Sequence, residues 1–231
     1  MNRPLRTLLL SWLSIGVNLA ATSEAQPALQ AGEIAARVQS FYDRTATIRA
    51  NFQQRYFLKL YDREETSSGT VVFKKPGRMR WNYDEPHQKV IVSNGQTLKV
   101  YEPPREGETR GQGYQQSMDD NQLPAVFAFL TGTGRLDEQF TFRLLDTRDS
   151  MGAAWDGYVL QLRPRSPSPH FEQVLFYVRL VEGAGIVERV LIVDPVGNRN
   201  LFEFQGLRFT TPIEERYFEF RFPRGTRIVT P

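Results

Sequence analysis

The chain has 231 residues, of which 40% are hydrophobic, 24% charged and 12% aromatic, and its formal net charge is +3. This composition is typical of a folded protein, and so small a positive charge is no argument for a nucleic-acid partner. The sequence contains no cysteine, which excludes disulfides, thiolate nucleophiles and zinc–thiolate sites. Its only histidines are His87 and His170, so a multi-histidine metal site is nearly excluded, and we expect no metal and no cofactor.

The segment 1–25 has the pattern of a cleaved secretory signal peptide. Arg3 and Arg6 supply a positive start, 8–21 is an almost uncharged apolar run, and small residues precede the cleavage point. As a helix this run rises only about 21 Å, short of the roughly 30 Å bilayer core, which disfavours a membrane anchor. No cysteine follows the run, which excludes a lipid-anchored lipoprotein. We expect an exported, soluble mature chain, 26–231, with a net charge of +2 after the loss of two arginines and one glutamate.

An amphipathic helix is predicted to follow this leader. From 31 to 48 the residues Ile34, Val38, Phe41 and Ile48 fall on one helical stripe, and the opposite face is charged. We therefore expect a helix over this range that lies on an apolar surface.

Beyond the helix the apolar period changes from 3.6 to 2, which predicts strands with one apolar and one wet face. Asn94-Gly95 between two apolar runs is the strongest hairpin signal, because both residue types tolerate positive φ, and 194–200 predicts a second hairpin turn. Roughly eleven strands joined by short loops follow from this pattern, which indicates a large antiparallel sheet or barrel. The clearest alternating runs are 158–162, 202–205 and 218–222.

Two segments interrupt the series of strands. Residues 102–121 are rich in Pro, Gly, Gln and Asp and predict a long surface loop. Residues 124–130 (PAVFAFL) are continuously apolar, with Pro near the start and Gly132 after the end, which favours a short helix buried on all sides. A buried strand is the alternative. The sequence shows neither an internal repeat nor a linker, so we expect 26–231 to form a single domain.

Catalytic signatures are missing from the sequence. It has no G-x-S-x-G elbow, no H-E-x-x-H pair and no G-x-x-x-x-G-K phosphate loop. Asp119 and Asp120 are adjacent in a polar stretch, where solvation or helix capping explains them better than paired catalysis. His87 and His170 each follow a proline in loop-like surroundings. We expect that the protein is not an enzyme.

The apolar faces of the strands exceed the elements available to cover them. A twisted sheet of about eleven strands must bury its apolar face, and only the first helix and 124–130 can lie on it. Two short elements leave a wide sheet partly uncovered, so a residual apolar cavity is expected. A tightly packed sandwich is the alternative that composition leaves open.

Five stretches of the mature chain form a characteristic set. They are RANFQQ at 49–54, GTVVFKKPGRMRW at 69–81, VIVSNGQTL at 90–98, LPAVFAFLTG at 123–132 and FEFRFPRGT at 218–226. The most specific part is the K-P-G-R-x-R-W block together with the S-N-G hairpin. Over nearly the whole mature chain, this set resembles the LolA family, the periplasmic carriers of outer-membrane lipoproteins.

The resemblance implies a fold, a function and partners. The family fold is an unclosed antiparallel β-barrel with a helical lid over an apolar cavity that receives the acyl chains of a lipoprotein. Such a carrier takes its cargo from an inner-membrane ABC transporter and delivers it to an acceptor lipoprotein at the outer membrane. We expect the protein to do this in the periplasm as a monomer.

The resemblance also assigns roles to individual residues, although each apolar one could equally be ordinary core. Lys75 occupies the place where many relatives have an arginine that bonds lid carbonyls in the closed state. Lysine lacks the planar fork of arginine, so we expect a weaker contact with these carbonyls here, and a plain surface lysine is the alternative. The residues matched to the cavity and its lid are Phe52, Trp81, Val126, Phe127, Phe129 and Leu130.

Two other classes of protein stay open at this point. A periplasmic sensor of lipid or lipoprotein could use the same fold, although such sensors usually add a second domain. A periplasmic hydrolase is the enzymatic alternative. Bound lipid without turnover would exclude the hydrolase, and transfer of that lipid to an acceptor would exclude the sensor.

Overall fold

The described part of the chain consists of twelve strands, two α-helices and two short 3-10 helices. The structure is a computed structural model that describes residues 29–118, 127, 129–146 and 155–229; the leader expected at 1–25 lies outside them. The helices are α1 (Ala31–Arg44), η1 (Lys59–Tyr61), α3 (Leu136–Gln139) and η2 (Glu215–Phe218). The strands are β1 (Thr47–Leu58), β2 (Arg63–Lys74), β3 (Arg78–Glu85), β4 (Lys89–Asn94), β5 (Thr97–Glu102), β6 (Gln112–Ser117), β7 (Phe140–Leu145), β8 (Tyr158–Pro164), β9 (Gln173–Val181), β10 (Ala184–Val193), β11 (Arg199–Phe209) and β12 (Arg227–Val229).

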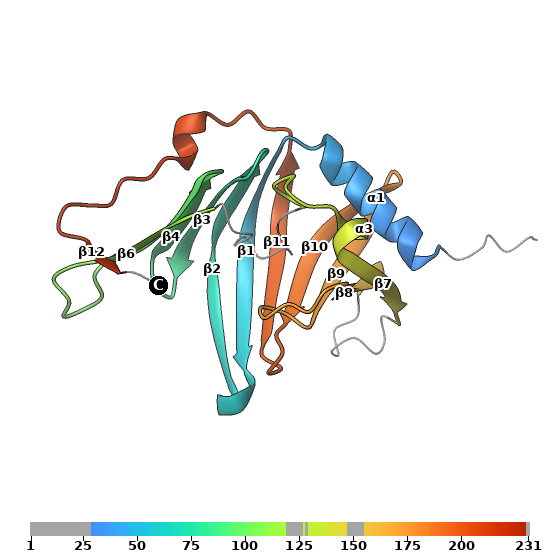
Figure 1. Cartoon of the computed structure of the whole chain (residues 1–231), viewed down its shortest axis with the longest axis horizontal. Helices are drawn as coiled ribbons and strands as arrows, with labels where there is room; N and C mark the ends of the chain where they lie inside the picture. The colour runs from blue at the N-terminus through green and yellow to red at the C-terminus, as the bar shows by residue number, and fades with distance from the viewer. Residues whose placement is uncertain (1–28, 119–126, 128, 147–154, 230–231) are drawn as a thin grey trace, which may run out of the picture.

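All these strands belong to one strongly twisted sheet (Figure 1). Its order is β12-β6-β5-β4-β3-β2-β1-β11-β10-β9-β8-β7, and the two ends of this order are different strands, so the sheet is unclosed. Neighbouring strands are antiparallel except β12, which runs parallel to β6. The expected unclosed antiparallel barrel is therefore confirmed, with twelve strands in place of about eleven.

The main core lies on the face of the sheet that carries α1, which we call the inner face (Figure 1). Strand β9 illustrates how alternation divides the residues. Val174, Phe176 and Val178 join the main core, whereas Leu175 and Tyr177 join a smaller cluster on the opposite, outer face. The alternating pattern had predicted a solvent-exposed outer face, but part of that face is covered by this second apolar cluster.

Helix α1 lies across β10, β8 and β7 on the inner face. Ile34, Val38 and Tyr42, spaced four residues apart, form its buried row, and each is at most 1% exposed. The helix ends at Arg44, so the expectation that it continues to 48 is wrong. Thr45 is already extended, and Ile48 pairs with β2 and β11 as part of β1. The described helices include none long and apolar enough to span a membrane.

The polar segment 102–121, expected to be a loop, contains strand β6. Residues 112–117 pair with β5 in continuous register, from Glu102 opposite Gln112 to Thr97 opposite Ser117. Backbone hydrogen bonds to neighbouring strands need no apolar side chains, so a polar strand such as β6, which lies between β12 and β5, has no alternating signature. The loop prediction is wrong for this part of the segment.

The aromatic run 218–222, expected to be a strand, is not one. It follows η2 and crosses the outer face of the sheet, where Phe218 packs with Val72 and Val92. Its backbone is bonded by side chains of the sheet: Lys99 Nζ donates to the Phe220 carbonyl at 2.8 Å. Alternation in this segment reflects packing against an existing sheet and not participation in it. The hairpins at 94–97 and 194–200 and the strands at 158–162 and 202–205 are confirmed.

Candidate functional site

An aromatic cluster on the inner face brings three of the predicted site residues together. Phe52 from β1 and Trp81 from β3 lie on either side of β2, with ring centroids 4.9 Å apart. The ring centroid of Phe127 lies 5.5 Å from that of Trp81, so the apolar segment to which Phe127 belongs reaches this cluster. All three side chains are at most 5% exposed. Their edge-on geometry is an arrangement that aromatic rings prefer, and it forms a predominantly apolar region on the inner face.

Four further rings complete this cluster and were not among the predicted site residues. Phe202 and Phe204 lie in a run whose alternation had predicted a strand, so their inward direction could have been inferred from it. Phe73 and Tyr83 could have been found in the same way, since each is two residues from another inward position on its strand. The distances between ring centroids are 5.4 Å for Trp81–Phe202, 6.3 Å for Trp81–Phe204, 6.2 Å for Phe73–Phe127 and 4.8 Å for Phe52–Tyr83.

The apolar segment expected to act as a lid covers this cluster. Phe127 is helical, and the N–H groups of Leu130 and Thr131 both donate to its carbonyl, at 3.0 and 3.3 Å. Phe129 lies between Tyr42 of α1 and the ring of Phe176 in β9, 5.1 Å from each. The segment therefore joins the aromatic cluster to α1. Val126, assigned to the same lid, lies outside the described residues.

Among the described residues, little free space remains between α1, Leu130 and the sheet strands beneath them. The gap bounded by β1, β2, β10, β11, α1 and Leu130 has a volume of about 10 Å³, at the lower limit of what a single water molecule needs. At this point of the inner face the described residues leave little of the cavity that the strand-to-cover ratio predicts. Large aromatic side chains from β1, β2, β3 and β11 fill the inner face themselves, which the count of covering elements did not consider.

Lys75, between β2 and β3, joins the sheet to the last carbonyls of α1. Its Nζ donates to the carbonyls of Tyr42 and Asp43, the latter at 3.3 Å. A helix C-terminus favours a cation in this position, because its last carbonyls lack intrahelical partners. Partial burial lowers the pKa of Lys75 below its usual value, and the Asp43 carboxylate opposes that effect. We call Lys75 and these two carbonyls the latch.

The lid segment also contacts the latch directly. A Cβ atom built on Gly132 would lie 2.8 Å from Cδ of Lys75, so the glycine lets the lysine stem pass. The Gly77 N–H donates to the Thr131 carbonyl at 3.0 Å. Lys75 and Gly77, both in the turn between β2 and β3, therefore each contact the lid segment.

Tyr42 fixes the same end of α1 to the sheet. Its hydroxyl accepts the N–H of Val187 at 3.2 Å, at the point where the register between β9 and β10 shifts. A bulge leaves a backbone donor without a ladder partner, and this hydroxyl supplies the acceptor. Burial raises the pKa of Tyr42 above its ordinary value, so the group stays neutral. Tyr42 extends the row of Ile34 and Val38, a spacing that could have identified it.

Residues that could support catalysis or metal binding are dispersed. His87 lies in the turn between β3 and β4 and His170 in the loop between β8 and β9, and both are exposed, as expected for loop residues. Within the described ranges no three His, Asp or Glu side chains gather in a way that could hold a metal ion. Asp119 and Asp120 lie outside the described residues.

Comparisons with known proteins identify similar sequences along most of the chain. The family model described as outer membrane lipoprotein carrier protein LolA matches residues 43–221. The outer-membrane lipoprotein carrier protein of Cupriavidus taiwanensis is 30% identical over 199 residues, which are 84% of this chain and 86% of that protein. The Azotobacter vinelandii protein of the same name is 27% identical over 228 residues, 98% of this chain and 99% of its own length. A solved LolA-superfamily structure from Nitrosomonas europaea shares 15% identity with a TM-score of 0.45, and covers 84% of this chain and 99% of its own.

Proposed function

The chain belongs to the family of the outer membrane lipoprotein carrier protein LolA, and from this premise we propose that it shields lipoprotein acyl chains during transfer between membranes. The chemistry of the inner face supports this role. A carrier of acyl chains needs a large apolar surface that water does not reach, and it needs no catalytic group.

The aromatic cluster around Trp81 is the observation that carries the proposal. Phe52, Trp81 and Phe127 are packed against one another, yet Phe127 belongs to a short segment separate from the sheet strands. If the segment swings away, an acyl chain can replace its rings on the same surface. Each buried methylene contributes about 0.8 kcal/mol, so a chain of about 14 carbons contributes on the order of 11 kcal/mol, enough to offset the lost ring contacts.

The latch gives the carrier a means of release. Charged hydrogen bonds from Lys75 to the carbonyls of Tyr42 and Asp43 stabilise the closed, empty state by at most about 3 kcal/mol. A carrier needs open and closed states that differ by only a few kcal/mol, because cargo must be held and then surrendered. We propose that Lys75 takes the role of the family arginine, and that Phe129, Leu130 and Val126 form the lid with Phe127.

The cellular setting is part of the same proposal. We propose that 1–25 is removed on export and that the single domain 26–231 works in the periplasm as a monomer. Its cargo would be outer-membrane lipoproteins, received from an inner-membrane ABC transporter and passed to an acceptor lipoprotein at the outer membrane. No cofactor enters this scheme, because transfer of a bound acyl chain makes and breaks no covalent bond.

The test is to identify what the protein carries. Mass spectrometry of the protein purified from the periplasm should find triacylated or diacylated species, and N-terminal sequencing should begin at or near Gln26. An apolar fluorescent probe should bind to the delipidated protein and be displaced by lipoprotein. Phe127→Asp should weaken that binding while far-ultraviolet circular dichroism shows the sheet intact.

Three outcomes would contradict the proposal. Probe binding equal to that of the parent in both Phe127→Asp and Phe129→Asp would show that the segment is not a lid. Turnover of the bound lipid would indicate a hydrolase. Stable lipid binding with no transfer to acceptor membranes would indicate a sensor.

A further inference from the structure

The end of the molecule farthest from the latch presents apolar side chains to water. Among the described residues five large hydrophobic side chains are exposed, and three of them lie in two neighbouring turns: Leu60 is 83% exposed, Tyr61 72% and Val196 70%. Single exposed apolar residues are common, but a cluster at a projecting point is unusual. We call these three residues the apolar tip.

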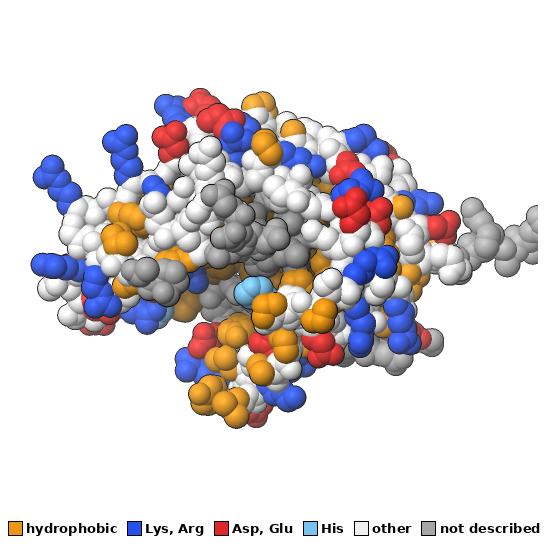
Figure 2. Space-filling model, in the orientation of Figure 1, with side chains coloured by type: hydrophobic (Ala, Val, Ile, Leu, Met, Phe, Trp, Pro, Cys, Tyr) orange, Lys and Arg blue, Asp and Glu red, His pale blue; other side chains and the backbone are white. Residues whose placement is uncertain are grey.

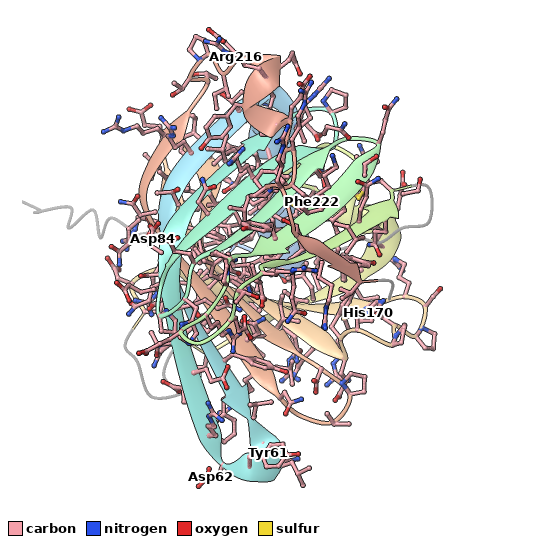
Figure 3. The ribbon with its side chains drawn as sticks, turned by 90° about the vertical axis from the view of Figure 1, so that its left-hand side faces the viewer. Tyr61, Asp62, Asp84, His170, Arg216 and Phe222 are labelled. Carbon is pink, nitrogen blue, oxygen red and sulfur yellow. The ribbon has the colours of Figure 1, made fainter. Side chains whose placement is uncertain are left out.

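The apolar tip projects beyond the rest of the molecule. The β1–β2 hairpin extends past its neighbours in two perpendicular views, with Tyr61 and Asp62 labelled at its end (Figures 1 and 3). Hydrophobic side chains gather over this projecting end on the molecular surface (Figure 2). Asp62 turns the chain with a left-handed φ of 46° immediately after η1.

Two turns are joined to form this tip. The backbone N–H of Lys59 donates to Oδ1 of Asn198 at 3.0 Å, which ties the β1–β2 turn to the β10–β11 turn. Asp194 in turn fixes the second turn, since its carboxylate accepts the N–H groups of Val196 and Asn198 at 3.0 and 2.9 Å. The tip is therefore pre-ordered, and its exposed side chains lose little freedom on contact with a partner.

The size and charge of the tip limit what it can bind. Three side chains expose a few hundred Å² at most, well below the roughly 800 Å² per partner of a stable protein interface. Lys59 and Arg63 are outnumbered by Asp62, Glu64 and Glu65, so attraction to an anionic surface cannot supply the affinity. A bilayer, in contrast, accepts a small wedge of apolar side chains, and tyrosine favours the interface between headgroups and acyl chains.

We propose that the apolar tip inserts into the surface of a lipid bilayer and holds the protein there transiently. The inference rests on the proposed function to the extent that a carrier of acyl chains must reach bilayers. Strand β2 separates the tip from Lys75 by twelve residues, about 40 Å of extended chain. Contact with the bilayer at the tip therefore leaves the latch and the lid unobstructed.

The experiment measures association of the purified mature protein with sucrose-loaded phosphatidylcholine vesicles by co-sedimentation. The parent should bind, and binding should persist in about 1 M NaCl, where charges are screened within about 3 Å. Leu60→Asp and Tyr61→Asp should each lower the partition constant about tenfold, because each removes the transfer of one apolar side chain from water. Tyr61→Trp should bind, and its added emission should be quenched by brominated acyl chains.

The matched controls are the other two exposed apolar residues. Val181→Asp in β9 and Ile228→Asp in β12 introduce the same charge on the surface away from the tip, and they should bind vesicles like the parent. Equal loss in tip and control variants would overturn the proposal, because added negative charge alone would explain it. Loss of parent binding in high salt would also overturn it, since adsorption would then be electrostatic.

Two further readouts decide the remaining cases. Absence of parent binding to protein-free vesicles, with tip-dependent binding to membranes that retain their proteins, would assign the tip to a protein partner and overturn the proposal. Binding of the apolar probe by tip variants should equal that of the parent. Vesicle binding in a protein that never takes up the probe would overturn the carrier function and leave the tip assignment standing.

Discussion

The two ends of the β1–β2 hairpin differ in which side chains they expose to solvent. One end partly buries a charged side chain, and the other exposes apolar ones. At the latch end a half-buried lysine, Lys75, is bonded to helix carbonyls, and Phe129 of the lid segment is buried. At the tip end Leu60 and Tyr61 stand in water, with no cover among the described residues. Partial burial of a cation and exposure of apolar groups both cost free energy, which the carbonyl bonds of Lys75 offset at the latch and no described contact offsets at the tip.

This difference indicates that the two ends of the hairpin contribute differently to the stability of the fold. The latch end contacts α1 and the lid, so changes there should alter stability and the balance between open and closed states. The tip contacts only another turn, so equivalent changes there should leave the fold almost unaffected. Pairs of substitutions at the two ends test this directly, and in three of the four pairs below the same residue type is replaced at both ends.

The largest contrast is expected for removal of a large apolar side chain. Phe129→Ala should lower the free energy of unfolding by about 3–5 kcal/mol, since it leaves a cavity between Tyr42 and Phe176. Leu60→Ala should change it by less than about 0.5 kcal/mol, because the side chain is exposed in the folded state too. Urea unfolding of both variants measures the difference. Similar midpoints would refute the assignment of Phe129 to the core of the closed state.

The second largest contrast is expected for replacement of a lysine at each end, measured as probe affinity and transfer to acceptor membranes. Lys75→Leu removes the charged hydrogen bonds of the latch, about 1.5–3 kcal/mol at most, and should raise probe affinity and slow transfer to acceptor membranes. Lys75→Arg should be tolerated or should tighten the latch, because it can make the same bonds. Lys59→Leu at the tip should leave probe affinity unchanged in the absence of membranes. Unchanged probe affinity and transfer in Lys75→Leu would make Lys75 an ordinary surface lysine.

The tyrosine hydroxyls give a smaller contrast. Tyr42→Phe leaves the buried Val187 N–H without its acceptor and should cost about 1–2 kcal/mol. Amide hydrogen exchange at Val187 should accelerate in the same variant. Tyr61→Phe removes an exposed hydroxyl and should change neither quantity. Equal effects would mean that the Val187 bond contributes nothing to holding α1.

The smallest contrast concerns two glycines with left-handed φ, Gly132 at 72° and Gly197 at 89°. A Cβ on each would meet a lysine Cδ at 2.8 Å, that of Lys75 in one case and of Lys59 in the other. Alanine in this conformation costs about 1 kcal/mol at either site. Gly132→Ala should cost about 1 kcal/mol more, because Lys75 must leave its carbonyls whereas Lys59 is free to swing into solvent. Equal thermal midpoints of the two variants would show that Lys75 can leave the α1 carbonyls without a loss of stability.

Much of the fold follows from local patterns. Two kinds of local pattern predict elements correctly, because each depends on residues a few positions apart. Alternation predicts the strands at 158–162 and 202–205, and turn residues predict the hairpins at Asn94-Gly95 and at the Asp194 turn. The same logic fails where the partner is distant in sequence. Strand β6 has a polar sequence and is held by its pairing with β5, and the aromatic run 218–222 packs on the outer face and adds no strand.

The candidate site shows the same division between local and distant information. The sequence by itself determined the class of fold and the family, because period-2 patterns and the motif block are local, and only the family resemblance matched Phe52 and Trp81 to the cavity. The tertiary structure alone decided that aromatic rings from four strands pack together on the inner face, and that the carbonyls bonded by Lys75 are those at the end of α1. It also placed Leu60, Tyr61 and Val196 at one projecting end. Contacts between segments more than a hundred residues apart depend on sheet order and twist, which no local pattern encodes.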